Sequence, residues 1–129
     1  MKAFAMGLAA AGLLAGCAQG PMARQEADRR ALAEAREVGE PVDCIELSRI
    51  EHTRVRDDRT VDFFMRGDRV YRNRLRHECS GLAFEESFAY RTSTGRLCSV
   101  DLITVNRGGG GLGPTCALGS FQRIETQAR

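Results

Sequence analysis

Five cysteines are the residues of this sequence whose types and positions restrict the chemistry most. A thiol can carry a lipid, close a disulfide bond, bind a metal ion or act as a nucleophile, and its surroundings decide between these uses. Cys17 follows a short apolar segment near the amino end. The other four are spread over a longer region of mixed polarity: Cys44, Cys79, Cys98 and Cys116. Cys17 is therefore considered apart from this group.

The first sixteen residues have the pattern of a secretory signal peptide. Lys2 supplies a positive start, residues 4–14 are mostly apolar, and the small residues Ala15-Gly16 precede Cys17. The apolar run is shorter than the roughly 20 residues needed to span a bilayer. The segment Leu14 to Cys17 resembles the lipobox of bacterial lipoproteins, which implies cleavage before Cys17 and acylation of its sulfur and amino group. An ordinary signal peptide with an incidental cysteine is the alternative.

The lipobox resemblance also implies a cellular location. Two or three acyl chains would anchor the protein firmly, because a single chain binds membranes only marginally. Ala18 stands where lipoproteins retained in the inner membrane carry Asp. We therefore expect an anchor in the outer membrane with the domain facing the periplasm, and a soluble periplasmic protein is the alternative.

The four remaining cysteines form an even set, as expected for disulfides in a small exported domain. The competing use is metal binding together with His52 and His77. Their spacing from Cys44 and Cys79 lacks the paired C-x₂₋₄-C and H-x₃₋₅-H pattern of structural zinc sites. We expect no metal and no other cofactor.

Arginines are the second group that could do chemistry. Residues 70–76 alternate, so that three arginines would share one face of a strand, and two further arginines share a face of an earlier strand. If the two faces coincide, the sheet carries an arginine stripe that could bind phosphates or carboxylates. Its members are Arg54, Arg56, Arg72, Arg74 and Arg76. The alternative is an ordinary solvated face balanced by nearby acids.

Net charge gives no reason to expect a nucleic-acid partner. Nineteen Lys and Arg residues oppose seventeen Asp and Glu. Lys2 lies in the expected signal peptide, so the mature chain is nearly neutral and only a local patch could attract an anionic polymer.

Composition divides the mature chain into two parts. Residues 17–41 are rich in Ala, Arg, Glu and Gln, with few bulky apolar side chains. Residues 22–38 favour a helix, which Gly39 and Pro41 would end. Such a helix has little to bury, so we expect a lipidated N-terminus followed by a polar, partly helical, solvated tether.

Residues 42–129 have the sequence pattern of an all-β domain. Short runs with β-forming residues are separated by turn signals, and the first three runs indicate consecutive hairpins. The expected strands cover 49–55, 61–65, 70–75, 84–92, 97–105 and 116–124. About six such strands predict a small antiparallel barrel or sandwich. Alternation places Val61, Phe63 and Met65 on one face and Asp62 on the other. The 97–105 run predicts a central strand in which Asp101 is a hydrogen-bonded structural carboxylate.

Strand directions favour one of the three disulfide connectivities. In an up-and-down meander, Cys44 and Cys98 lie at one end of the sheet, whereas Cys79 and Cys116 lie at the other. Bridged Cα atoms must approach to about 4.4–6.8 Å. The meander thus favours Cys44–Cys98 and Cys79–Cys116, but a crossover between the third and fourth strands would change the pairing.

Several longer stretches resemble a family of small exported proteobacterial proteins known only as a domain of unknown function. They are "CIELSRIEHTRVRDDRTVDFFMRGDRVYRNRL", "YRTSTGRLCSVDLITV" and "GGLGPTCALGSF", within residues 42–122. The resemblance implies an envelope location and a shared fold, and it implies no activity.

Two functional interpretations follow. The first is a non-catalytic cell-envelope lipoprotein with a structural or protein-interaction role, whose partners are the membrane and an envelope protein. The second is a binding module for anionic envelope ligands through the arginine stripe. An enzyme is third, because the sequence contains no G-x-S-x-G, H-E-x-x-H or phosphate-loop motif.

Overall fold

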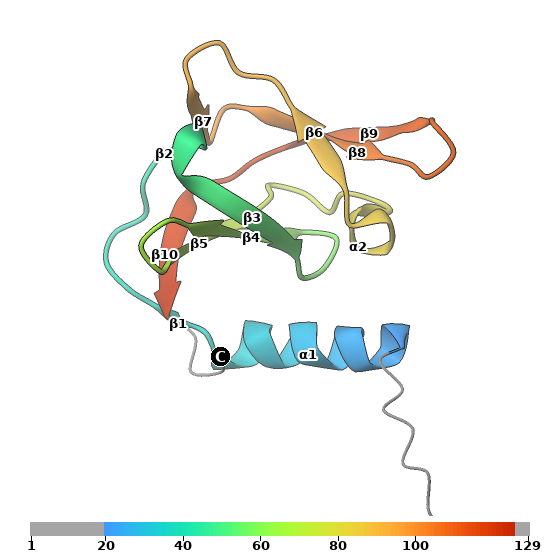
Figure 1. Ribbon diagram of the computed structural model, residues 1–129, viewed down its shortest axis with the longest axis horizontal. Coiled ribbons are helices and arrows are strands. Elements are labelled where there is room, and N and C mark those ends of the chain that lie inside the picture. Colours follow the sequence, from blue (N-terminus) through green and yellow to red (C-terminus); the bar gives the residue numbers. More distant parts are fainter. Residues whose placement is uncertain (1–19, 126–129) are drawn as a thin grey trace, which may run out of the picture.

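The computed structural model describes residues 20–125, which form three antiparallel sheets and an amino-terminal helix (Figure 1). The largest sheet has the order β1-β10-β5-β4-β3, the second pairs β2 with β7, and the third has the order β6-β8-β9. The strands are β1 (Arg36–Glu37), β2 (Cys44–Glu46), β3 (Ile50–Val55), β4 (Thr60–Met65), β5 (Arg69–Arg74), β6 (Phe88–Tyr90), β7 (Arg96–Cys98), β8 (Leu102–Asn106), β9 (Leu112–Ala117) and β10 (Phe121–Glu125). Helix α1 spans Pro21–Glu34, helix α2 spans Leu82–Glu85, and a 3₁₀ turn, η1, spans Leu47–Arg49. Within residues 20–125 no helix is long and apolar enough to cross a membrane.

Strands β3, β4 and β5 form the meander that the sequence predicts. Arg66 to Asp68 turn the chain between β4 and β5, and both Gly67 and Asp68 adopt positive φ there, a conformation that Gly and Asp tolerate better than most residues. Val61 and Phe63 are fully buried and Met65 nearly so, as their alternation predicts. These side chains point into the core, which leaves Asp62 and Phe64 on the opposite face of the sheet.

The core lies between the inner face of the five-stranded sheet and the other two sheets. Phe63 is at its centre and packs edge-to-face against Phe88 of β6 and Phe121 of β10, at centroid distances of 6.3 and 5.5 Å. Such pairs contribute about 0.5–1.5 kcal/mol beyond the area they bury. The Phe63–Phe88 contact therefore joins the five-stranded and three-stranded sheets.

Two expected strands are wrong in part. Residues 84–92 begin with α2, which is bracketed by positive φ at Gly81 and Glu86, and only Phe88–Tyr90 form a strand. The 97–105 run is divided into β7 and β8 by a turn. There the backbone N–H of Cys98 donates to Asp101 Oδ2 at 2.7 Å, so the Asp101 carboxylate accepts a local bond that stops the strand.

The last expected strand is also divided, at Gly119. A Cβ on Gly119 would lie 2.2 Å from the carbonyl oxygen of Arg74, so only glycine fits this close approach. Buried Asn73 bonds both backbone groups of Gly119, its Nδ2 donating to the carbonyl at 2.7 Å and its Oδ1 accepting from the N–H at 2.9 Å. The chain leaves β9 here and enters β10 in another sheet. The all-β prediction is confirmed as a mostly-β fold of antiparallel sheets. Residues 20–125 contain ten strands where about six were expected, and they form no closed barrel.

All four cysteines of residues 20–125 form disulfides. Cys44 bonds Cys98 within the β2–β7 pair, and Cys79, just before α2, bonds Cys116 of β9. These are the pairs that the strand directions favour. Two disulfides in so small a domain indicate an oxidising, extracytoplasmic location.

Candidate functional site

The expected arginine faces coincide in the five-stranded sheet. The strand register aligns Arg54 of β3 with Asp62 of β4, and Asp62 in turn with Arg72 of β5. The three side chains lie on the face opposite the core, where Arg54 and Arg72 contact helix α1. Figure 1 shows α1 running along this side of the sheet. A carboxylate between two arginines was not part of the expected stripe.

Asp62 is the centre of this polar cluster and is fully buried. One carboxylate oxygen accepts from Arg72 Nε at 2.8 Å, and the other accepts from Arg72 NH2 and Arg56 Nε, each at 2.9 Å. The Arg72 contact is a bidentate pair, the strongest geometry for a guanidinium and a carboxylate. Asp62 is thus saturated by two buried guanidinium groups.

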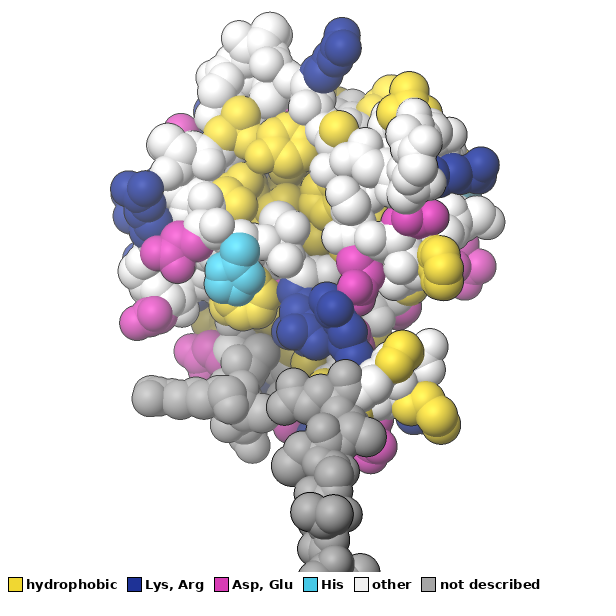
Figure 2. Space-filling model, turned by 45° about the vertical axis from the view of Figure 1, so that its right-hand side comes forward, with side chains coloured by type: hydrophobic (Ala, Val, Ile, Leu, Met, Phe, Trp, Pro, Cys, Tyr) yellow, Lys and Arg dark blue, Asp and Glu magenta, His cyan; other side chains and the backbone are white. Residues whose placement is uncertain are grey.

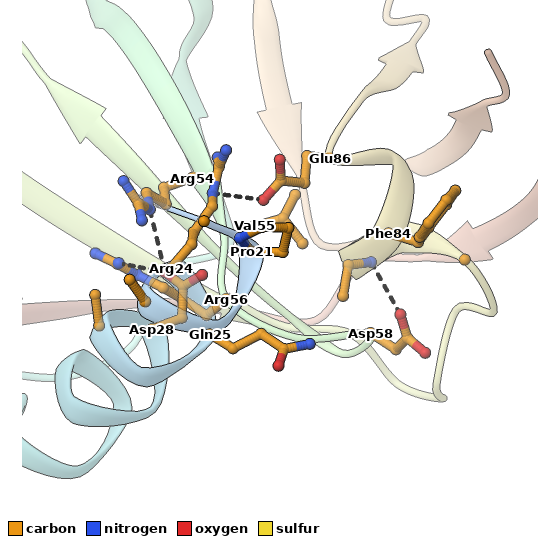
Figure 3. A pocket seen from close by; sticks show the side chains of 15 residues that line it. Pro21, Arg24, Gln25, Asp28, Arg54, Val55, Arg56, Asp58, Phe84 and Glu86 are labelled. Carbon is orange, nitrogen blue, oxygen red and sulfur yellow. Dashed lines mark hydrogen bonds and ion pairs between the residues drawn. The ribbon is translucent and has the colours of Figure 1, made fainter. Parts of the chain in front are cut away.

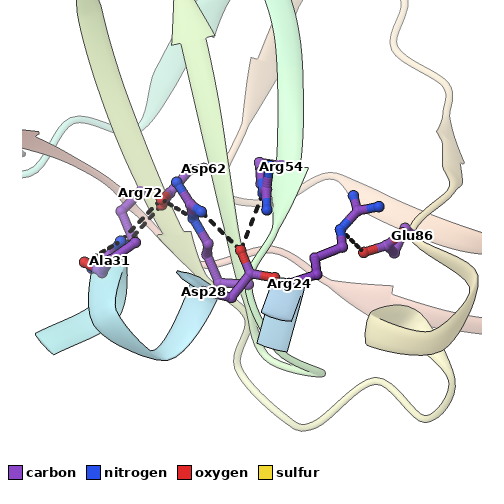
Figure 4. Close-up of polar contacts among 8 residues, drawn as sticks. Arg24, Asp28, Ala31, Arg54, Asp62, Arg72 and Glu86 are labelled. Carbon is purple, nitrogen blue, oxygen red and sulfur yellow. Dashed lines mark hydrogen bonds and ion pairs between the residues drawn. The ribbon is translucent and has the colours of Figure 1, made fainter. Parts of the chain in front are cut away.

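Asp28 of α1 supplies the second carboxylate (Figure 4). Its Oδ1 accepts from Arg56 NH1 at 2.8 Å and from Arg54 Nε at 3.1 Å. The main-chain carbonyl of Ala31, one turn further along α1, lies 3.5 Å from Arg72 NH2. We call Asp28, Arg54, Arg56, Asp62 and Arg72 the arginine–aspartate cluster. It joins the helix to three adjacent strands.

This arrangement corrects the expectation of a solvated tether. Helix α1 lies along the sheet, and β1 adds to the sheet edge beside β10. Asp28 is buried although the helix has almost no apolar stripe. The physical reason is charge: two carboxylates are needed to balance three arginines on one covered face. Cys17 and the expected lipid lie outside residues 20–125.

The same contacts determine what the arginine stripe can do. Arg54, Arg56 and Arg72 already hold carboxylates. Arg74 is largely exposed and lies 3.7 Å from Glu37 Oε1, while Arg76 Nε donates to the carbonyl of Leu118 at 3.1 Å. The five side chains therefore do not form one continuous exposed row of free guanidinium groups.

A groove of about 1150 Å³ opens between the first turns of α1, the end of β3 and helix α2 (Figure 3). Arg24 Nε pairs with Glu86 Oε1 at 2.7 Å across it. On its other side, the backbone N–H of Ala83 donates to Asp58 Oδ1 at 2.9 Å. Phe84 lines this α1–α2 groove and is 87% exposed, although the sequence places it in a strand face.

A smaller groove, of about 340 Å³, lies between β3 and β6. We call it the edge groove, because β3 is the last strand of the five-stranded sheet and β6 the last of the three-stranded sheet. Its apolar lining residues are Leu47, Ile50, Phe88 and Tyr90. Figure 2 shows hydrophobic side chains lining a hollow on this face, with a histidine at its rim.

The histidines do not converge with other chemical groups. His52 stacks on Phe64, with ring centroids 4.4 Å apart, and His77 is exposed in the loop after β5. In the described part of the chain, no three His, Cys, Asp or Glu side chains are grouped so that they could hold a metal ion.

No curated protein and no solved structure matches this sequence. The model of one family, described as a family of unknown function (DUF6491), matches residues 1–129. Because this match covers the whole chain, the protein belongs to the DUF6491 family.

Proposed function

We propose that the protein is a non-catalytic lipoprotein of the cell envelope, anchored through acylated Cys17, whose β domain binds a partner protein. The signal-peptide pattern, the lipobox and the two disulfides support export and anchoring. The proposed location is the outer membrane, with the domain facing the periplasm. The observation that carries the binding role is the edge groove.

The edge groove has the features of a site for an extended peptide. Strands β3 and β6 each pair with a single neighbour in their sheets, so the other side of each can accept a further strand. In strand addition, backbone hydrogen bonds provide affinity and pockets for alternate side chains provide specificity. Leu47, Ile50 and Phe88 would contact the inward-facing side chains of the added segment.

The charges at the rim of the edge groove restrict which peptide sequences can bind there. Glu86 is already paired with Arg24, whereas exposed Glu51 has no ion-pair partner among the described residues. A segment with alternating apolar side chains and a Lys or Arg opposite Glu51 would complement the groove. The β3–β4 register shifts between Ile50 and His52, and such a bulge limits open-ended pairing between copies of the same edge.

Anion binding by the arginine stripe has less support as an alternative. Arg54, Arg56 and Arg72 are committed to Asp28 and Asp62, and an anionic ligand would have to displace a carboxylate that is already well bonded.

Photocrosslinking in the intact envelope tests the proposed role. A photoreactive amino acid in place of Thr53, which lines the edge groove on β3, should form a covalent adduct with a defined envelope protein. Thr115 is the matched control, since it is an exposed threonine on β9, the opposite edge of the three-stranded sheet. Introducing Ile50→Arg into the Thr53 variant should abolish the adduct, because it fills the groove with a charge.

The outcomes are distinct. An adduct that forms at position 53, is absent at position 115 and is lost with Ile50→Arg supports the groove. Equal adducts at both positions, or an adduct unaffected by Ile50→Arg, would overturn the proposal.

A further inference from the structure

Two nearly fully exposed apolar side chains stand at one end of the domain. Met22, in the first turn of α1, is 83% exposed, and Phe84 of α2 is 87% exposed. Pro21 and Ala23, the neighbours of Met22, line the α1–α2 groove together with Phe84 (Figure 3). Single exposed apolar residues are common on soluble proteins. Here one large apolar side chain lines a groove and a second adjoins two of its lining residues, which marks a candidate interaction surface.

The position of Cys17 in the sequence connects this end of the domain with the membrane. Pro21 begins α1 and lies four residues after Cys17. Four residues span at most about 14 Å when fully extended. If Cys17 carries acyl chains, as the proposed function requires, the first turn of α1 is held within that distance of the lipid.

Helix α1 cannot move independently of the domain without breaking ion pairs. Arg24 joins it to Glu86 beside α2, and Asp28 joins it to Arg54 and Arg56. Holding the start of α1 near the bilayer therefore brings α2, and Phe84 with it, to the same surface.

We propose that this end of the domain rests on the phospholipid bilayer, with Met22 and Phe84 inserted at the boundary between headgroups and acyl chains. This inference rests on the proposed lipid anchor. The acyl chains supply most of the affinity, and the two side chains fix the orientation of the domain. The arginines beside the groove are paired with acids, so the contact is apolar and should persist at high salt and on vesicles without anionic lipid.

Tryptophan fluorescence can test the contact cleanly, because the chain contains no tryptophan. The acylated Phe84→Trp protein would be reconstituted in phosphatidylcholine vesicles with brominated acyl chains, which quench tryptophan only on close approach. Met22→Trp is a second probe of the same surface. Val100→Trp is the control, since Val100 is 79% exposed but lies in the turn between β7 and β8.

We expect at least twofold stronger quenching for Phe84→Trp and Met22→Trp than for Val100→Trp, unchanged in high salt. Flotation with the vesicles reports the anchor separately. Protein that fails to float contradicts the proposed anchoring. Protein that floats but shows equal quenching at all three positions, or loses its quenching in high salt, overturns the apolar bilayer contact while leaving the anchor intact.

Discussion

Replacing Asp62 with alanine is expected to destabilise the domain by about 3–5 kcal/mol, the usual cost of removing one partner from a buried ion pair. Asp62 is fully buried and accepts three hydrogen bonds from Arg56 and Arg72. Without it, Asp28 is the only carboxylate left for three arginines under α1. Equilibrium denaturation of wild type and Asp62→Ala would measure the loss in the free energy of unfolding.

A matched control separates two contributions to the loss of stability: the cost of leaving a buried charge unpaired and the cost of lost packing. The triple variant Arg56→Met, Asp62→Leu and Arg72→Met removes Asp62 together with both of its partners, keeps similar volume and leaves Asp28 paired with Arg54. Such replacements are often neutral or stabilising, so this variant should be more stable than Asp62→Ala alone. A loss below about 1 kcal/mol for Asp62→Ala, a value typical of exposed ion pairs, would contradict the buried cluster.

Removing the Cys79–Cys116 disulfide is the second change with a large expected effect. The double variant Cys79→Ala and Cys116→Ala should lose about 2–5 kcal/mol, because the bond restricts the unfolded chain over a sequence separation of 37 residues. Fully buried Cys79 lies just before α2, and Cys116 belongs to β9, so the bond also fixes α2 against the three-stranded sheet. Thermal and denaturant unfolding would measure the change.

The other disulfide provides the comparison. Cys44 and Cys98 face each other in the two-stranded β2–β7 sheet, which is too small to be stable alone. Their removal should increase hydrogen exchange locally in β2 and β7 as well as lowering stability. If reducing both disulfides leaves the unfolding midpoint unchanged, neither bond has the structural role assigned to it.

The parts of the fold that sequence predicts well are those in which one local pattern decides the structure. Val61, Phe63 and Met65 fall on one face by alternation, and the Gly67-Asp68 turn lies between two β-forming runs, so β4 and β5 are recognisable. Phe84 shows the limit of this reasoning. It begins the segment 84–92, which was expected to form one strand, but Gly81 and Glu86 adopt positive φ on either side of the helical turn α2.

The breaks at Asp101 and Gly119 depend on contacts that alternation does not reveal. The Asp101 carboxylate ends β7 by accepting a backbone bond. Gly119 is required because the backbone of β5, distant in sequence, approaches too closely for any Cβ. Runs that read as single strands are therefore divided between sheets.

Only the strand residues of the arginine–aspartate cluster can be predicted from the sequence. Alternation places Arg54 and Arg72 on corresponding faces, and the hairpin register brings Asp62 between them. Asp28 could not be identified, because α1 is polar on all sides and its buried face follows from the charge of the sheet, not from an apolar stripe.

The intact mass of the protein, extracted from its native membrane without reductant, tests the lipid anchor and the disulfides together. We expect a chain that begins at Cys17, carries the added mass of its acyl groups, and has four hydrogen atoms fewer than the fully reduced form, two for each disulfide. An unacylated amino terminus, or a mass that corresponds to free thiols, would contradict this expectation.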